Sequence, residues 1–155
     1  EIKQVTDGQF DVNGLVGLSG NTLVVTRTDM NHASEIYTVN LKNGEMSQLT
    51  HQNDDTYNEI SLSKIEKRMV TTTDGKEMVT WVIYPPNFDP NKKYPTLLYC
   101  QGGPQGALSQ FYSYRWNFQL MAAQGYIVVA PNRRGMPGYG VGRGGGGRGG
   151  IKEIF

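Results

Sequence analysis

The sequence of 155 residues predicts an all-β region followed by an α/β region, and three observations support this division. Residues 10–50 consist of short β-type runs separated by turns, without a helical period. Residues 69–84 form a hairpin pattern. Residues 95–140 then follow the order strand, glycine-rich turn, helix and strand, which is the order of a βαβ unit with parallel strands. We place the boundary near residue 65, so that the first region covers residues 1–64.

Four short antiparallel strands are expected in the first region. In one of them Tyr37, Val39 and Leu41 alternate with polar residues, which is the period of two that a half-buried strand shows. Asn43-Gly44 follows and is a strong hairpin signal. Four strands in about forty residues are the size of one propeller blade, although a small meander packed on the later domain fits the same pattern. The expected strands are residues 15–18, 22–27, 35–41 and 46–50.

The second region is expected to begin with an antiparallel hairpin. Asp74-Gly75 supplies the tight turn between two β-rich runs. Residues 59–68, which precede the hairpin, predict a linker or the ragged start of a strand. Alternation places one set of residues on the same face of the second strand. This set is Val79, Trp81 and Ile83.

The stretch of residues 95–140 organises the rest of the chain. Its apolar run Thr96–Cys100 predicts a buried strand, in which the lone thiol of Cys100 is a small core residue. The run breaks at Gly102-Gly103-Pro104. A helix with apolar Phe118, Met121 and Ala122 is expected next, ended by Gly125 and followed by a second buried strand at Tyr126–Ala130.

The sequence itself resembles a known family at this point. The segments KYPTLLYCQGGPQG (residues 93–106), AAQGYIVVAPNRRG (122–135) and GYG (138–140) resemble the prolyl oligopeptidase family of serine peptidases, in its dipeptidyl-peptidase and acylaminoacyl-peptidase branch. The resemblance implies an α/β-hydrolase domain capped by a β-propeller. Residues 65–140 would start the hydrolase domain, and residues 1–64 would be the last propeller blade and a linker. It also implies a serine exopeptidase that releases short peptides, of dipeptide length, through an acyl-enzyme, without metal or organic cofactor.

The resemblance further implies part of an active site, because the chemistry of a parallel sheet lies beyond the carboxyl ends of its strands. In the family, the turn after the first of these parallel strands helps to build the oxyanion hole, where preorganised donors stabilise the tetrahedral intermediate. Gly102 and Gly103 are the candidate donors, since glycine lets a backbone N–H approach closely. Gln101 stands where some members carry a donating Tyr or His. One arginine of the expected rim either braces the loop by an ion pair or faces solvent. The rim consists of Asn132, Arg133 and Arg134.

The groups that would create an oxyanion are not found in the sequence. In this fold the triad runs Ser, Asp, His, and the Ser lies in a G-x-S-x-G turn between strand and helix. Gly17-Leu18-Ser19-Gly20 falls short of this motif because Asn21 follows. His32 and His51 come too early in the chain and are expected to be solvated loop residues, and Asp54-Asp55 an exposed loop acid pair. The chain alone is therefore predicted to be inactive without the remainder of its own polypeptide.

Composition excludes few classes of function. The formal net charge of +1 argues neither for nor against nucleic acid. No apolar run approaches the roughly 20 residues of a membrane span, and the single cysteine excludes an internal disulfide. By resemblance the partner is a peptide substrate and not a nucleic acid, a homodimer fits the family, and the location is periplasmic or secreted. Composition is equally compatible with the cytoplasm.

Residues 141–155 form an atypical glycine-rich tail, and nine of the thirteen residues 138–150 are glycine. An artefact in the sequence, a flexible linker and an arginine–glycine segment that binds RNA each explain this composition. Against RNA, Arg143 and Arg148 supply few phosphate contacts. The tail matches G-x-G-x-x-G only as any glycine run does. The alternative to a peptidase is a non-catalytic β-rich binding module with this basic tail.

Overall fold

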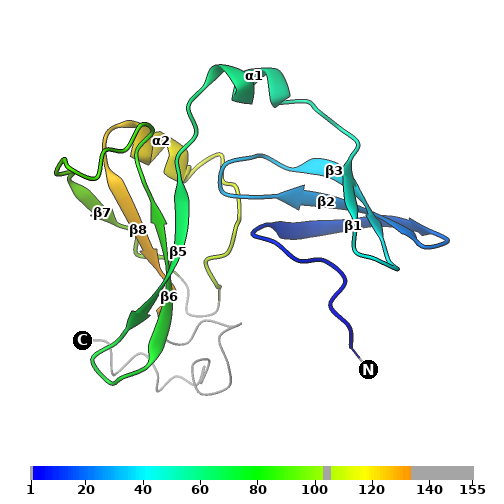
Figure 1. The fold of residues 1–155 in the computed structure, drawn as a ribbon, viewed down its shortest axis with the longest axis horizontal. Helices are drawn as coiled ribbons and strands as arrows, with labels where there is room; N and C mark the ends of the chain where they lie inside the picture. The colour runs from blue at the N-terminus through cyan, green and yellow to red at the C-terminus, as the bar shows by residue number, and fades with distance from the viewer. Residues whose placement is uncertain (1, 103–105, 134–155) are drawn as a thin grey trace. The chain divides into compact units, whose positions relative to one another are not determined.

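The chain folds into two units in the computed structural model, which describes residues 2–102 and 106–133 (Figure 1). The first unit comprises Glu1–Leu62 and Ser109–Asn117, and the second comprises Ser63–Leu108 and Phe118–Phe155. The predictions for Gly103, Arg134 and the tail lie outside the described residues.

The first unit contains one four-stranded antiparallel sheet in the order β1-β2-β3-β4, with the four strands that the sequence predicts. Its turns use the left-handed conformation at Gly20 (φ +57°) and at Gly44 (φ +76°), which glycine adopts without steric cost. Val25 and Val39, each 1% exposed, lie at its core. The strands are β1 (Asp11–Ser19), β2 (Thr22–Thr28), β3 (Glu35–Asn40) and β4 (Met46–Gln48).

A short helix, α1 (Asp54–Glu59), follows the first sheet. The prediction that Asp54-Asp55 lies in a loop is wrong, because both residues form the first turn of this helix. Acidic side chains suit that position, since the N-terminal end of a helix carries partial positive charge. Ala33 N–H donates to the Tyr57 hydroxyl at 2.8 Å, which fastens the helix to the loop between β2 and β3.

The second unit contains a four-stranded mixed sheet in the order β5-β6-β8-β7 (Figure 1). Its hairpin turns at Asp74-Gly75 as predicted, with Gly75 at φ +76°. The first hairpin strand begins at Ile65, within the stretch expected to be a linker or the ragged start of a strand. The strands are β5 (Ile65–Thr71), β6 (Glu77–Ile83), β7 (Thr96–Leu98) and β8 (Ile127–Pro131).

Strand β6 is buried on both faces. Its residues from Val79 to Ile83 are at most 7% exposed. The strand lies between β5 and β8, and inner strands of α/β sheets are commonly covered on both sides. The set that alternation places on one face is buried, and so are Thr80 and Val82 of the other face.

Strands β7 and β8 are parallel, as the strand–helix–strand order predicts. The connection contains α2 (Phe118–Ala123), which buries Phe118 and Ala122 and packs on β8 and β6. The chain leaves α2 at Gly125, whose φ of +87° is typical of a glycine that ends a helix. Each helix of the described residues has six residues, and neither could cross a bilayer.

The expectation of a buried first parallel strand is wrong. All three residues of β7 are exposed, and so is Cys100. Among the described residues the strand lies at the edge of the sheet and pairs with β8 alone. An apolar run of this length predicts a strand but cannot distinguish an inner strand from an edge strand.

Candidate functional site

The described residues that the sequence singled out follow the ends of the two parallel strands. Because β7 and β8 are adjacent and parallel, Gln101 and Asn132 follow neighbouring strand ends. Gly102 is exposed, and a Cβ added to it would have no atom within 4 Å. Gln101 is half-buried, and its side-chain oxygen has no hydrogen-bond donor among the described residues.

Asn132 is buried and holds the segment that follows the glycine turn by hydrogen bonds. It is 5% exposed, and its side-chain amide forms two hydrogen bonds with the backbone of Leu108. Leu108 N–H donates to Oδ1 at 2.7 Å, and Nδ2 donates to the Leu108 carbonyl at 2.9 Å. Trp81 Nε1–H donates to the same carbonyl at 2.9 Å. Arg133, the next rim residue, is half-buried.

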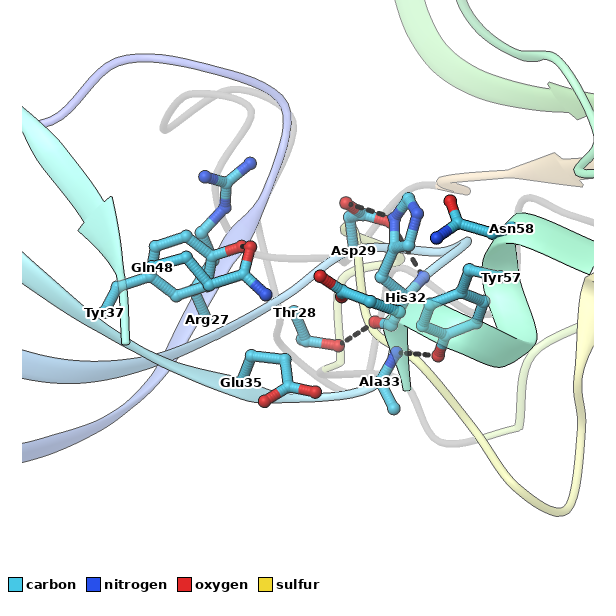
Figure 2. A pocket seen from close by; sticks show the side chains of 11 residues that line it. Arg27, Thr28, Asp29, His32, Ala33, Glu35, Tyr37, Gln48, Tyr57 and Asn58 are labelled. Carbon is cyan, nitrogen blue, oxygen red and sulfur yellow. Dashed lines mark hydrogen bonds and ion pairs between the residues drawn. The ribbon is translucent and has the colours of Figure 1, made fainter. Parts of the chain in front are cut away.

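The first unit holds a polar pocket of about 330 Å³ that the sequence did not predict (Figure 2). Figure 2 shows Tyr37 and Arg27 on one side of it, with His32 and Tyr57 on the other. The pocket is lined by β2, β3, β4, the β2–β3 loop and α1. Its residues are Arg27, Thr28, Asp29, His32, Ala33, Glu35, Tyr37, Gln48, Asp54, Tyr57 and Asn58.

Asp29 and His32 form a hydrogen-bonded pair in this pocket. The His32 Nδ1 lies 2.8 Å from Asp29 Oδ1, which also accepts the backbone N–H groups of Asn31 and His32. The hydrogen bond to Asp29 raises the pKa of His32, and it outweighs the opposing effect of burial. Burial works to raise the pKa of the Asp29 carboxyl, but the bond and charge of His32 leave that pKa lowered.

This pairing corrects one histidine prediction and leaves the other in place. The His32 side chain is only 43% exposed, and its ring meets the Tyr57 ring edge-on at 4.8 Å. His32 is therefore a bonded pocket residue and not a freely solvated one. His51 also pairs with an aspartate, since its Nδ1 lies 2.7 Å from Asp54 Oδ2, but its side chain is 58% exposed, as expected of a solvated loop residue. The spacing of three residues between Asp29 and His32 was the available signal for the pair.

The charges of the pocket are largely satisfied from within the first unit. Glu35 is 6% exposed, and its carboxylate accepts the Gln52 N–H at 3.0 Å, the Asn53 amide and the Thr50 hydroxyl. The Arg27 guanidinium stacks 4.2 Å from the centre of the Phe10 ring, and among the described residues it has no ion pair. The described residues contain no cluster of three metal-ligating side chains. The pocket is therefore a polar one whose charged groups are mostly bonded within the unit.

No triad is assembled among the described residues. Ser19 ends β1, at the hairpin with β2, and forms no side-chain hydrogen bond there to a histidine. Its strand leads to a β-turn and not to a helix, whereas the nucleophile turn of hydrolases joins a strand to a helix. The position of Ser19 therefore agrees with the prediction that it is not catalytic.

Three comparisons with known proteins bear on this arrangement. Residues 112–142 match the model of the prolyl oligopeptidase family. The chain is 48% identical over 140 residues to a dipeptidyl-peptidase 5 of Porphyromonas endodontalis, which covers 90% of the chain and 20% of the relative. A Pyrococcus horikoshii acylaminoacyl peptidase structure matches with a TM-score of 0.75 at 26% identity, over 90% of the chain and 21% of the neighbour.

A second solved structure gives the same result. An acylaminoacyl peptidase in complex with Z-Gly-Gly-Phe-chloromethyl ketone matches with a TM-score of 0.78 at 25% identity, over 93% of the chain and 22% of the neighbour. The chain thus spans about one fifth of the length of the relatives it matches.

Proposed function

We propose that this chain, whose resemblance to the prolyl oligopeptidase family is confirmed, is part of a serine peptidase that releases short peptides, of dipeptide length, from the amino termini of oligopeptides. The observation that carries the proposal is the 48% identity to a dipeptidyl-peptidase 5 across 90% of the chain. In this proposal residues 1–64 are the last propeller blade and its linker, and residues 65–140 begin the hydrolase domain. The same resemblance supports a periplasmic or secreted location.

In the proposed reaction this chain stabilises charge and does not create it. The nucleophile, base and orienting acid come from the remainder of the polypeptide. When the serine attacks the scissile carbonyl, the carbonyl oxygen becomes negative. The backbone N–H groups of the Gly102-Gly103 turn donate hydrogen bonds to this oxygen. Loss of one such donor typically slows an enzyme by about 100-fold to 1,000-fold. The chain alone holds these donors without a nucleophile and is expected to be inactive.

The environment of Gly102 supports this role. Its φ is not among the positive values of the described glycines, and an added Cβ would meet nothing within 4 Å. Neither backbone conformation nor packing in the described residues therefore calls for glycine here. Close approach of a substrate oxygen to the backbone does call for it.

Fluorophosphonate labelling of the intact protein tests the proposal, because the reagent forms a covalent bond with an activated serine. We expect stoichiometric labelling of the intact protein and none of the isolated 155-residue chain. A dipeptidyl-naphthylamide substrate should be cleaved to a dipeptide and free naphthylamine. A folded intact protein that takes up no label would contradict the proposal.

Gly102→Ala sharpens this experiment. The open space around Gly102 predicts wild-type folding, whereas the added methyl group should slow labelling at least about tenfold by crowding the oxyanion. Gly17→Ala is the matched control, because its Cβ also meets open space and Gly17 lies in β1. Equal labelling rates for both variants would remove Gly102 from the proposed site.

A further inference from the structure

We infer that Asp11, in the first strand of the first unit, is a positioning residue that fastens the segment following the Gly102-Gly103 turn. Its effect on turnover rests on the proposed function, whereas its effect on the segment does not. Asp11 lies about 90 positions before that turn in the sequence.

Asp11 uses both of its carboxylate oxygens on this segment. Oδ2 accepts a hydrogen bond from the Ser109 hydroxyl, and Oδ1 accepts the Gln110 backbone N–H at 3.2 Å. These partners lie 98 and 99 positions from Asp11 in the sequence. Bonds in which one partner is charged are stronger than neutral ones, so a single carboxylate can fix two consecutive residues. Asp11 is the first residue of β1, a regular element that holds its backbone in place.

Gln110 adds a second attachment to the same unit. Its side-chain oxygen accepts the Met30 backbone N–H at 3.3 Å, and the two residues are 5% and 2% exposed. The side-chain nitrogen of Gln110 has no acceptor among the described residues. The bonds to Asp11 and Met30 therefore determine the position of Gln110, although this position leaves one group of its side-chain amide without a hydrogen bond among the described residues.

Leu108, the residue just before Ser109, is held by hydrogen bonds within the second unit. Leu108 belongs to the second unit, where Asn132 binds both its N–H and its carbonyl, and Ser109 belongs to the first. Ser109 follows Leu108 directly, and only a few residues separate this pair from Gly102 along the chain. We therefore expect loss of the Asp11 bonds to loosen the segment that leads back to the proposed oxyanion turn.

Removal of the Asp11 carboxylate should misalign the proposed oxyanion donors and should not remove a contact with substrate. Misplacement of a catalytic group by about 1 Å can cost about 100-fold in rate. We expect Asp11→Ala to lower kcat of the intact enzyme about tenfold to 100-fold, with KM changed less than about threefold, because oxyanion donors act mainly in the transition state. Asp11→Asn should retain most of the activity. Its amide oxygen can still accept the Gln110 N–H, and its NH₂ can donate to the Ser109 hydroxyl oxygen.

The test combines kinetics with hydrogen exchange on the intact enzyme. Exchange of residues 106–110 should be faster in Asp11→Ala than in wild type, while β2 and β3 remain unchanged. Asp55→Ala is the matched control, since Asp55 is an exposed carboxylate of the same unit. If Asp11→Ala does not fold, Ser109→Ala removes one of the two bonds and should lower kcat about threefold to fivefold, in keeping with the modest net worth of one hydrogen bond.

The outcomes separate this inference from the proposed function. Wild-type kcat and wild-type exchange of residues 106–110 in Asp11→Ala would overturn it. So would a lower melting temperature with unchanged kcat of the folded fraction, since that is a merely structural role. If wild type itself takes up no fluorophosphonate, the proposed function fails, and the exchange of residues 106–110 still decides whether Asp11 fastens the segment.

Discussion

Asn132→Ala provides the most direct test of how the segment after the glycine turn is held. The substitution removes the two hydrogen bonds that the Asn132 amide makes with Leu108, at 2.7 Å and 2.9 Å. It leaves the Leu108 carbonyl with its bond from Trp81, but the Leu108 N–H loses its acceptor. Leu108 is 0% exposed, so water cannot replace that acceptor without local opening.

The expected cost follows from these contacts. Each lost hydrogen bond contributes about 1 kcal/mol net, and a buried N–H left without an acceptor costs about 1 to 3 kcal/mol. We expect the free energy of local opening around Leu108 to fall by about 2 to 4 kcal/mol. Since 1.4 kcal/mol is a factor of ten, the exchange of the Leu108 amide should accelerate by between about thirtyfold and about a thousandfold.

Hydrogen exchange resolved to residues 106–110 measures this change in the intact protein. Asn58→Ala is the control, because Asn58 is an exposed asparagine of the first unit. Asn132→Asp tests the chemistry of the bond pair, since it keeps the acceptor for Leu108 N–H but sets a carboxylate oxygen against the Leu108 carbonyl. An acceleration below about threefold in Asn132→Ala would refute the reasoning, because it would leave no room for even one net hydrogen bond.

Two further predictions concern other parts of the chain. The pKa of His32 is raised in the folded state, so its stabilisation of the first unit is present below about pH 6.5 and is lost as the pH rises through the folded pKa. Asp29→Asn should weaken that dependence and return the His32 pKa, followed by NMR, toward about 6.5; an unmoved pKa would show that Asp29 is not its cause. Gly44 and Gly75 both have a φ of +76°, so replacing either by alanine costs about 1 kcal/mol of backbone strain. The two variants differ in packing, because only at Gly44 would the new Cβ lie 2.1 Å from the Val5 carbonyl oxygen. Limited proteolysis should therefore release residues 2–8 faster in Gly44→Ala alone, and equal cleavage in both variants would exclude the contact with Val5.

The local architecture was predictable because its signals are local. The Asp74-Gly75 turn, the period of two around Tyr37 and the helix ended by Gly125 each depend on a few neighbouring residues. Burial was less predictable. Thr96–Cys100 has the composition of a core strand, but its exposure is set by which strands pair with it and not by its own sequence.

The candidate site shows the same division between local and distant information. The places of Gly102 and Asn132 in the fold could be predicted because each follows a recognisable strand, whereas their roles in a site stay predictions. The partner of Asn132 could not be predicted. Leu108 lies 24 positions away, and an asparagine amide can bond to the backbone of any residue that lies within reach. The contact of Asp11 with Ser109 spans 98 positions and leaves no periodic or spacing signal at all.

These distant contacts determine how the effects of substitutions should be interpreted under the proposed function. The proposed oxyanion donors are backbone groups, so no side chain can be deleted to remove them, and their alignment depends on what holds the neighbouring segment. Under that proposal, substitutions at Asp11 or Asn132 should lower kcat through the segment that these side chains bind. Substitutions at Arg27 in the pocket of the first unit instead alter a cation that no acid pairs among the described residues. A loss of turnover in a variant of the first unit is consequently evidence about substrate binding only when the hydrogen bonds of residues 108–110 remain intact.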